Sequence, residues 1–155
     1  MDADPTPRKL PARANGLLDV WKDIVFVLTG MEEGPLRLTA EAHDDAPPLD
    51  LDDWDEVVEV SQFSSSGRAV VTELLGDVPE GVPQLVLPRE TWFRVRCHAR
   101  GRDEANARPR LSPDEDPIEE HLLQMWPAPE AEDVCHRVTD EVGQIFRSRS
   151  QVRPA

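Results

Sequence analysis

The stretch TWFRVRCHAR, residues 91–100, alternates between two kinds of side chain at every position. One set is mainly apolar and the other is cationic or aromatic: Thr91, Phe93, Val95, Cys97 and Ala99 against Trp92, Arg94, Arg96, His98 and Arg100. This period of two is typical of an antiparallel strand with one buried face and one wet face. We therefore expect the first set in the core. The second set should pair with carboxylates such as Glu59 on a neighbouring strand.

Runs of β-branched and aromatic residues, bounded by Gly, Pro and Ser, predict further strands on both sides. Leu17–Thr29 reads as one long strand, or as two strands with a kink near Lys22-Asp23. A hairpin is expected around the turn at residues 64–67, whereas Gly101–Pro117 is polar and reads as a long loop. The remaining expected strands are the two arms of that hairpin, two short pieces and the partner of residues 91–100: Val57–Val60, Arg68–Leu75, Leu36–Ala40, Leu85–Leu87 and His121–Trp126.

The period changes after Pro129. An apolar stripe at helical spacing contains Val134, Cys135, Val138, Val142, Ile145 and Phe146. Acidic residues lie at the start of this region and Arg147 and Arg149 at its end, as the helix dipole favours. Only Gly143 opposes a helix, by about 1 kcal/mol relative to Ala.

These patterns predict a mainly β fold: a single antiparallel β-sandwich of six to seven short strands with one C-terminal amphipathic helix. The expected parts are a flexible N-terminal arm (1–14), the β-sandwich domain (15–128), the helix packed on that domain (129–148) and a flexible tail (149–155). The length of 155 residues suits one domain.

The formal net charge of −14 opposes direct binding to nucleic acid or to an anionic membrane surface. Cys97 and Cys135 are the only cysteines and lack the short spacing of a zinc or redox pair, so we expect two buried free thiols. No secretion signal or membrane span is visible in the sequence. These features favour a cytoplasmic protein.

An acidic segment stands out between Arg37 and Arg68, where the sequence has no Lys or Arg. It does not fit a calcium loop, because an EF-hand starting at Asp50 needs Gly at position 55 and Glu at position 61. Two interpretations stay open: a solvated loop in which Trp54 is a plug that ties the loop to the core, or a docking surface with Trp54 as its anchor. The candidate partner-binding residues are Asp44, Asp45, Asp50, Asp52, Asp53, Trp54, Asp55 and Glu56.

Signatures of catalysis and of metal binding are absent from the sequence. His43, His98, His121 and His136 show no metal-ligand spacing, and neither a nucleophile elbow nor a phosphate-binding loop is present. We therefore expect no cofactor, no metal and no catalytic residue. The alternative is a small metal-binding or hydrolytic domain that uses His98 and His121, if antiparallel pairing brings them together beside the neighbouring acids Glu119 and Glu120.

Three segments, Val57–Ser61, Trp92–Asp103 and Glu119–Ala128, resemble a family of small uncharacterised bacterial proteins. The shared pattern is a strand reading Arg-Val-Arg-x-x-Ala-Arg-Gly-Arg-Asp and then a strand ending Gln-x-Trp-Pro-Ala. That family has no assigned activity. The layout of residues 16–127 is also similar to the competence protein J group of acidic nuclease inhibitors, although this resemblance transfers no site residues and this chain adds a C-terminal helix.

The sequence thus favours a non-catalytic, acidic protein-binding module, with an inhibitor or immunity protein that neutralises a basic partner such as a nuclease as one form of it. A structural subunit of a larger assembly is a further alternative, since the C-terminal apolar stripe could be an oligomer interface.

Overall fold

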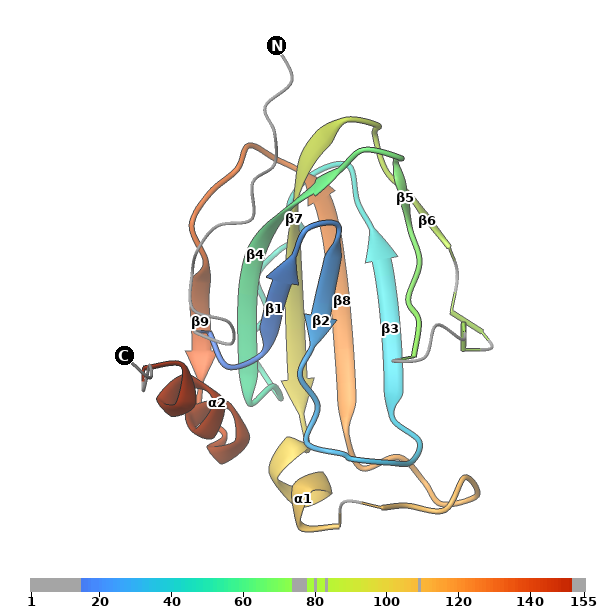
Figure 1. Ribbon diagram of the computed structural model, residues 1–155, viewed down its shortest axis with the longest axis vertical. Coiled ribbons are helices and arrows are strands. Elements are labelled where there is room, and N and C mark those ends of the chain that lie inside the picture. Colours follow the sequence, from blue (N-terminus) through green and yellow to red (C-terminus); the bar gives the residue numbers. More distant parts are fainter. Residues whose placement is uncertain (1–14, 74–77, 80, 83, 109, 152–155) are drawn as a thin grey trace.

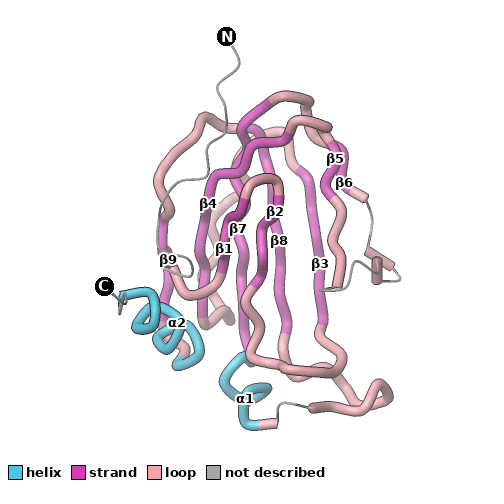
Figure 2. Tube along the Cα trace, viewed as in Figure 1, coloured by secondary structure: helices cyan, strands magenta, loops and turns pink. Residues whose placement is uncertain are grey.

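The computed structural model describes residues 15–73, 78–79, 81–82, 84–108 and 110–151. Its fold is mainly β with a C-terminal helix, which confirms the predicted fold class (Figures 1 and 2). The strands are β1 (Leu18–Trp21), β2 (Ile24–Val27), β3 (Arg37–Ala42), β4 (Glu56–Ser64), β5 (Arg68–Ala69), β6 (Leu85–Val86), β7 (Thr91–Arg100), β8 (Glu120–Pro127) and β9 (Val134–Val138); the helices are α1 (Arg102–Ala107) and α2 (Glu141–Gln151). The predicted N-terminal arm and residues 152–155 of the predicted tail lie outside the described residues.

A five-stranded sheet in the order β3-β8-β7-β4-β9 forms the body of the molecule. The β1–β2 hairpin lies across one face of this sheet, which we call the inner face, and a short β5–β6 ribbon lies beside β3 (Figure 1). The hairpin turns at Lys22, whose φ is 53°, so the predicted kink is confirmed as a turn between two strands.

The main core fills the space between the inner face and the hairpin. Phe93, Val95, Cys97 and Leu123 are all buried there, as the period-two pattern predicts. They pack with Leu18 of the hairpin and with other apolar side chains of β4 and β8. The predicted identity of the buried face of residues 91–100 is therefore correct.

The pairing of the strands differs from the prediction in two respects. β3 runs parallel to β8, so the sheet is mixed rather than wholly antiparallel. β4 does not form a hairpin with β5, because β4 lies between β7 and β9 while β5 pairs with β6. The chain turns away after Ser64, whose hydroxyl oxygen accepts the Gly67 N–H at 2.9 Å, and Gly67 O accepts the Leu87 N–H at 2.7 Å.

The C-terminal helix begins later than predicted, at Glu141, and Val134–Val138 forms strand β9. The valines whose spacing suggests one helix belong to two elements. Val134 and Val138 lie in β9, which pairs with β4, and Val142 lies in α2. The division into a sandwich at 15–128 and a helix at 129–148 is therefore wrong, because the sheet continues to Val138. Cys135, predicted to be buried, is exposed on this edge strand.

The predicted loop at Gly101–Pro117 contains the short helix α1, and this difference has a clear cause. Arg102 lies in the first turn of α1 and its side chain is fully buried. Its Nε donates to Asp140 Oδ2 at 2.7 Å, and its Nη2 donates to Asp140 Oδ1 at 2.8 Å and to Glu56 Oε1 at 3.3 Å. Nη1 donates to the carbonyl oxygens of Gly16 and Leu28, both at 2.9 Å. This buried ion cluster fixes α1 against α2, β4 and the hairpin.

Gly143 lies directly against the buried ion cluster, which explains why α2 contains a glycine. A Cβ at this position would overlap Glu56 Oε1, and it would lie 2.7 Å from Asp140 Oδ1 and 2.8 Å from Arg102 Nη2. The close approach of the helix backbone to the charged groups therefore requires the absence of a side chain.

Gly143→Ala should lower the free energy of unfolding by roughly 1–3 kcal/mol through overpacking, although Ala is the better helix former by about 1 kcal/mol. Chemical denaturation measures the change. Gln144→Ala, on the exposed neighbour, is the control and should stay within about 0.5 kcal/mol of the wild type. A Gly143→Ala variant as stable as the wild type would contradict the close packing of α2 on the cluster.

Candidate functional site

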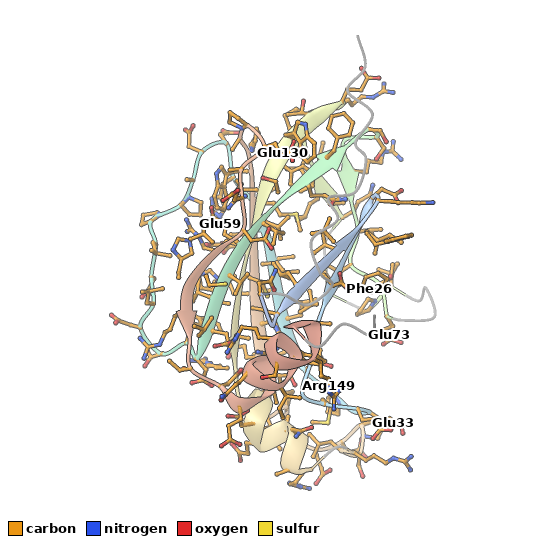
Figure 3. The ribbon with its side chains drawn as sticks, turned by 60° about the vertical axis from the view of Figure 1, so that its left-hand side comes forward. Phe26, Glu33, Glu59, Glu73, Glu130 and Arg149 are labelled. Carbon is orange, nitrogen blue, oxygen red and sulfur yellow. The ribbon has the colours of Figure 1, made fainter. Side chains whose placement is uncertain are left out.

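The second face of the sheet, which we call the outer face, carries the cationic residues of β7. The sequence predicts a wet face, but Arg94, Arg96 and His98 are only 4%, 5% and 1% exposed. Two connecting segments cover them: residues 43–55, which we call the acidic strap, and residues 128–133. Figure 3 shows the strap running along the outer face, with Glu59 on the sheet beneath it. The wet-face prediction is therefore wrong, because residues distant in sequence shield this face.

Glu59 pairs with both central arginines of the outer face. Its Oε2 accepts Arg94 Nε and its Oε1 accepts Arg96 Nε, each at 3.0 Å, which is the pairing predicted from the sequence. His136 Nε2 lies 3.1 Å from Oε1 of the same carboxylate. Burial raises the pKa of Glu59, but the hydrogen bonds from His136, Arg94 and Arg96 outweigh it, so the pKa is lowered overall. Both arginines thus have an internal carboxylate partner, which they share.

Hydrogen bonds to backbone groups of the strap attach it to the sheet at both ends and near its middle. At the ends, His43 N donates to Met125 O at 2.8 Å and Asp55 N donates to Ala99 O at 2.9 Å. Near the middle, Arg96 Nη1 donates to Pro47 O at 3.0 Å. The strap is therefore held along its length.

Trp54 provides a further attachment. Its ring centroid lies 5.3 Å from that of His98, and the Arg100 guanidinium lies over the indole at 4.9 Å from the ring centroid. Arg100 in turn is paired with Glu120. This arrangement supports the interpretation of Trp54 as the plug that ties the segment to the core, rather than as a freely presented anchor.

The predicted partner-binding residues fall into three groups. Trp54 and Asp55 are half-buried, and Asp55 Oδ2 accepts the Gly101 N–H at 3.1 Å. Glu56 is fully buried in the ion cluster, so its assignment to a docking surface is wrong. Glu56, Val58 and Val60 are alternate residues of one strand and therefore share a face. This spacing in the sequence indicates that Glu56 points inward with the two valines. The exposed residues of the set are Asp44, Asp45, Asp50, Asp52 and Asp53.

His98 and His121 do not meet. β7 and β8 pair in antiparallel fashion as predicted, but the register places His98 opposite Leu122 and His121 opposite Ala99. Directly paired residues share a face, so His98 lies on the outer face and His121 on the inner face. The catalytic or metal-binding alternative that requires both histidines together is therefore not available to this fold.

His121 instead belongs to a buried polar chain that sequence reasoning missed. Its Nδ1 lies 3.7 Å from Cys97 Sγ, and its Nε2 is hydrogen-bonded to Glu119 Oε2. Glu119 Oε1 accepts the N–H groups of Gly30 and Met31. The order thiol, imidazole, carboxylate resembles the arrangement that activates a nucleophile. Here burial raises the pKa of Cys97, and its side chain is inaccessible to solvent. The role of this hydrogen-bonded series is therefore to satisfy buried polar groups.

No group of three or more His, Cys, Asp or Glu residues in the described ranges is arranged to hold a metal ion. Within the same ranges, none of the helices has the length and apolar character needed to cross a membrane. Comparisons of the chain with protein-family models, curated proteins and solved structures find no match. The resemblances drawn from the sequence motifs stay predictions.

The two thiols should differ sharply in reactivity. In the native protein a maleimide should label Cys135, which is exposed, while Cys97 should react only after denaturation. Since burial raises the pKa of Cys135 above its ordinary 9.0, its labelling rate should keep rising beyond pH 9. Mass spectrometry of labelled protein measures both, with Cys135→Ser as the control. Native labelling of that variant would show that Cys97 is accessible.

Trp54→Ala should lower the free energy of unfolding by about 1–2 kcal/mol, because it removes the ring contact with His98 and the cation–π contact with Arg100. Trp21→Ala is the matched control, since Trp21 is 56% exposed, and its effect should stay within about 0.5 kcal/mol. Thermal denaturation compares the two variants. Equal effects would mean that Trp54 does not hold the strap.

Proposed function

We propose that the protein is a non-catalytic binding module that presents the acidic strap to a basic protein partner. The observation that carries this proposal is the set of five exposed aspartates, Asp44, Asp45, Asp50, Asp52 and Asp53, on a segment attached to the sheet at several points. An attached segment loses little conformational entropy on binding, so its charges can contribute fully to recognition.

The electrostatics of the outer face support the same proposal. Among the described residues, two cations contact the strap: Arg96, which is buried and paired with Glu59, and Arg100, which is partly exposed and paired with Glu120. The strap itself contains no Lys or Arg. Its outward potential is therefore negative, which raises the association rate with a basic surface and opposes like-charged partners. An inhibitor or immunity protein that covers the basic cleft of a nuclease is one form of such a module, and a cytoplasmic location is part of the proposal.

The test compares two triple charge reversals with equal changes of net charge. Asp44, Asp45 and Asp52 are replaced by Lys in the first, because their exposed carboxylates make no hydrogen bond within the part of the chain that the structure describes. Glu32, Asp114 and Asp116, exposed in loops away from the strap, are replaced in the second. Proteins captured from a lysate of the source organism by the wild type are identified, purified and measured against both variants.

The strap variant should associate more slowly with the captured partner while dissociation changes little, because exposed charges mainly steer encounter. Raising the salt from about 0.05 M to about 0.5 M should remove the difference, since the Debye length shrinks severalfold. Stopped-flow kinetics measure both rates. The control variant should associate nearly as fast as the wild type. Unchanged kinetics of the strap variant at low salt, or equal slowing of both variants, would contradict docking through the strap.

A further inference from the structure

We propose that His98 makes the acidic strap responsive to pH: a neutral imidazole lets the strap lie closed on the sheet, and protonation of that ring releases it. The significance for partner binding rests on the proposed function, because the strap is the surface assigned to the partner. The release itself is a property of this chain alone and is measured without any partner.

The geometry places His98 under the strap. The side chain lies on the outer face at 1% exposure, and the ring of Trp54 is its neighbour from the strap. Nδ1 lies 3.1 Å from Leu122 O. A carbonyl oxygen only accepts, so Nδ1 carries the proton of the neutral ring. A second proton, taken from solvent, must therefore go to Nε2.

Two arginines flank His98 on the same face of β7, Arg96 before it and Arg100 after it. Both are already paired, Arg96 with Glu59 of β4 and Arg100 with Glu120 of β8. The outer-face row of β7 already holds Arg94, Arg96 and Arg100, so a charged imidazole adds a fourth cation. The carboxylates beside this row are already paired with the arginines. Val57 and Leu122, which are opposite His98 on β4 and β8, offer no charge to compensate it.

Two carboxylates favour the charged form of His98 and so raise its pKa: Asp50 of the strap and Glu41 of β3. Glu41 is already hydrogen-bonded to His43 and Gln124. Burial is the largest influence on His98 and lowers its pKa below 6.5, with Arg96 adding to the effect and the Leu122 hydrogen bond, Asp50 and Glu41 opposing it.

The sign of the pH dependence follows from this direction. When the strap lifts, His98 meets water and its pKa returns toward 6.5, so the open form takes up a proton more readily than the closed form. The closed strap is therefore fully stable above about pH 6.5 and loses stability as the pH falls below that value. One proton limits the change in the opening equilibrium to about tenfold per pH unit.

The other histidines near the strap differ from His98 in their neighbours. His43 is hydrogen-bonded to Glu41, and His136 to Glu59. A positive ring at either position would face the carboxylate that it already contacts, whereas a positive ring at His98 would face Arg96 and Arg100. His121 pairs with Glu119 on the inner face, away from the strap. Loosening of the strap in acid thus singles out His98.

Amide hydrogen exchange followed by NMR tests the proposal at the two ends of the strap, the N–H groups of His43 and Asp55. Exchange is measured from pH 7.5 to pH 5.0 and corrected for the intrinsic rate at each pH. Protection at both amides should fall below about pH 6.5, while amides within the β4–β7 ladder stay protected. His98→Gln should remove the pH dependence, whereas His43→Gln should keep it.

A measurement on the wild type covers the case in which His98→Gln does not fold. The His98 ring resonance should titrate below pH 6.5, and strap protection should stop falling once the pH passes the midpoint of that titration. Strap protection that is flat with pH, that keeps its slope in His98→Gln, or that loses its slope in His43→Gln would overturn the proposal. Failure to find a basic partner would remove the proposed function and leave this result untouched.

Discussion

The guanidinium of Arg102 is the group on which the arrangement of the described elements depends. An arginine has five N–H donors, and here all of them are used inside the protein. The acceptors come from the residues before β1 and after β2, from the start of β4, and from Asp140 at the beginning of α2. Burial of such a charge costs several kcal/mol, which only complete hydrogen bonding can offset. The hairpin, α1, α2 and the sheet are therefore fixed relative to one another by the need to satisfy one side chain.

The position of the acidic strap follows from this cluster. The strap ends at Asp55, and the next residue, Glu56, is held by Arg102 and Arg147 on the inner face. Three positions later on the same strand, Glu59 lies on the outer face and binds Arg94 and Arg96. The odd separation places the two carboxylates on opposite faces. Strand β4 thus contributes a carboxylate to the ion cluster on the inner face and another carboxylate to the buried arginines of the outer face.

The sequence predicts those features that depend on local periodicity. The alternation in residues 91–100 correctly predicts β7 and its buried side chains, because pleating alone decides which residues share a face. Prediction from local periodicity fails where one pattern spans two elements, and where residues distant in sequence cover a face of the sheet. Val134, Val138 and Val142 have the spacing of one helical stripe, but the first two lie in β9 and the third lies in α2. The helical spacing is therefore a coincidence. Nothing local to β7 indicates that residues 43–55 lie over its arginines. The register that separates His98 from His121 differs by a single residue from one that would join them.

The folding requirements of this protein account for its buried charges but not for the exposed aspartates of the strap. Arg94 and Arg96 share the carboxylate of Glu59, and Arg102 is paired with Asp140 and Glu56. Trp54 and the Pro47 carbonyl oxygen attach the strap. Asp44, Asp45, Asp52 and Asp53 make no such contribution through their carboxylates within the described residues, and like charges at close spacing repel one another. Features that oppose local stability without a compensating contact are expected at functional sites. The physical case for a docking surface therefore rests mainly on these four exposed aspartates rather than on Trp54 or Glu56, which the fold itself requires.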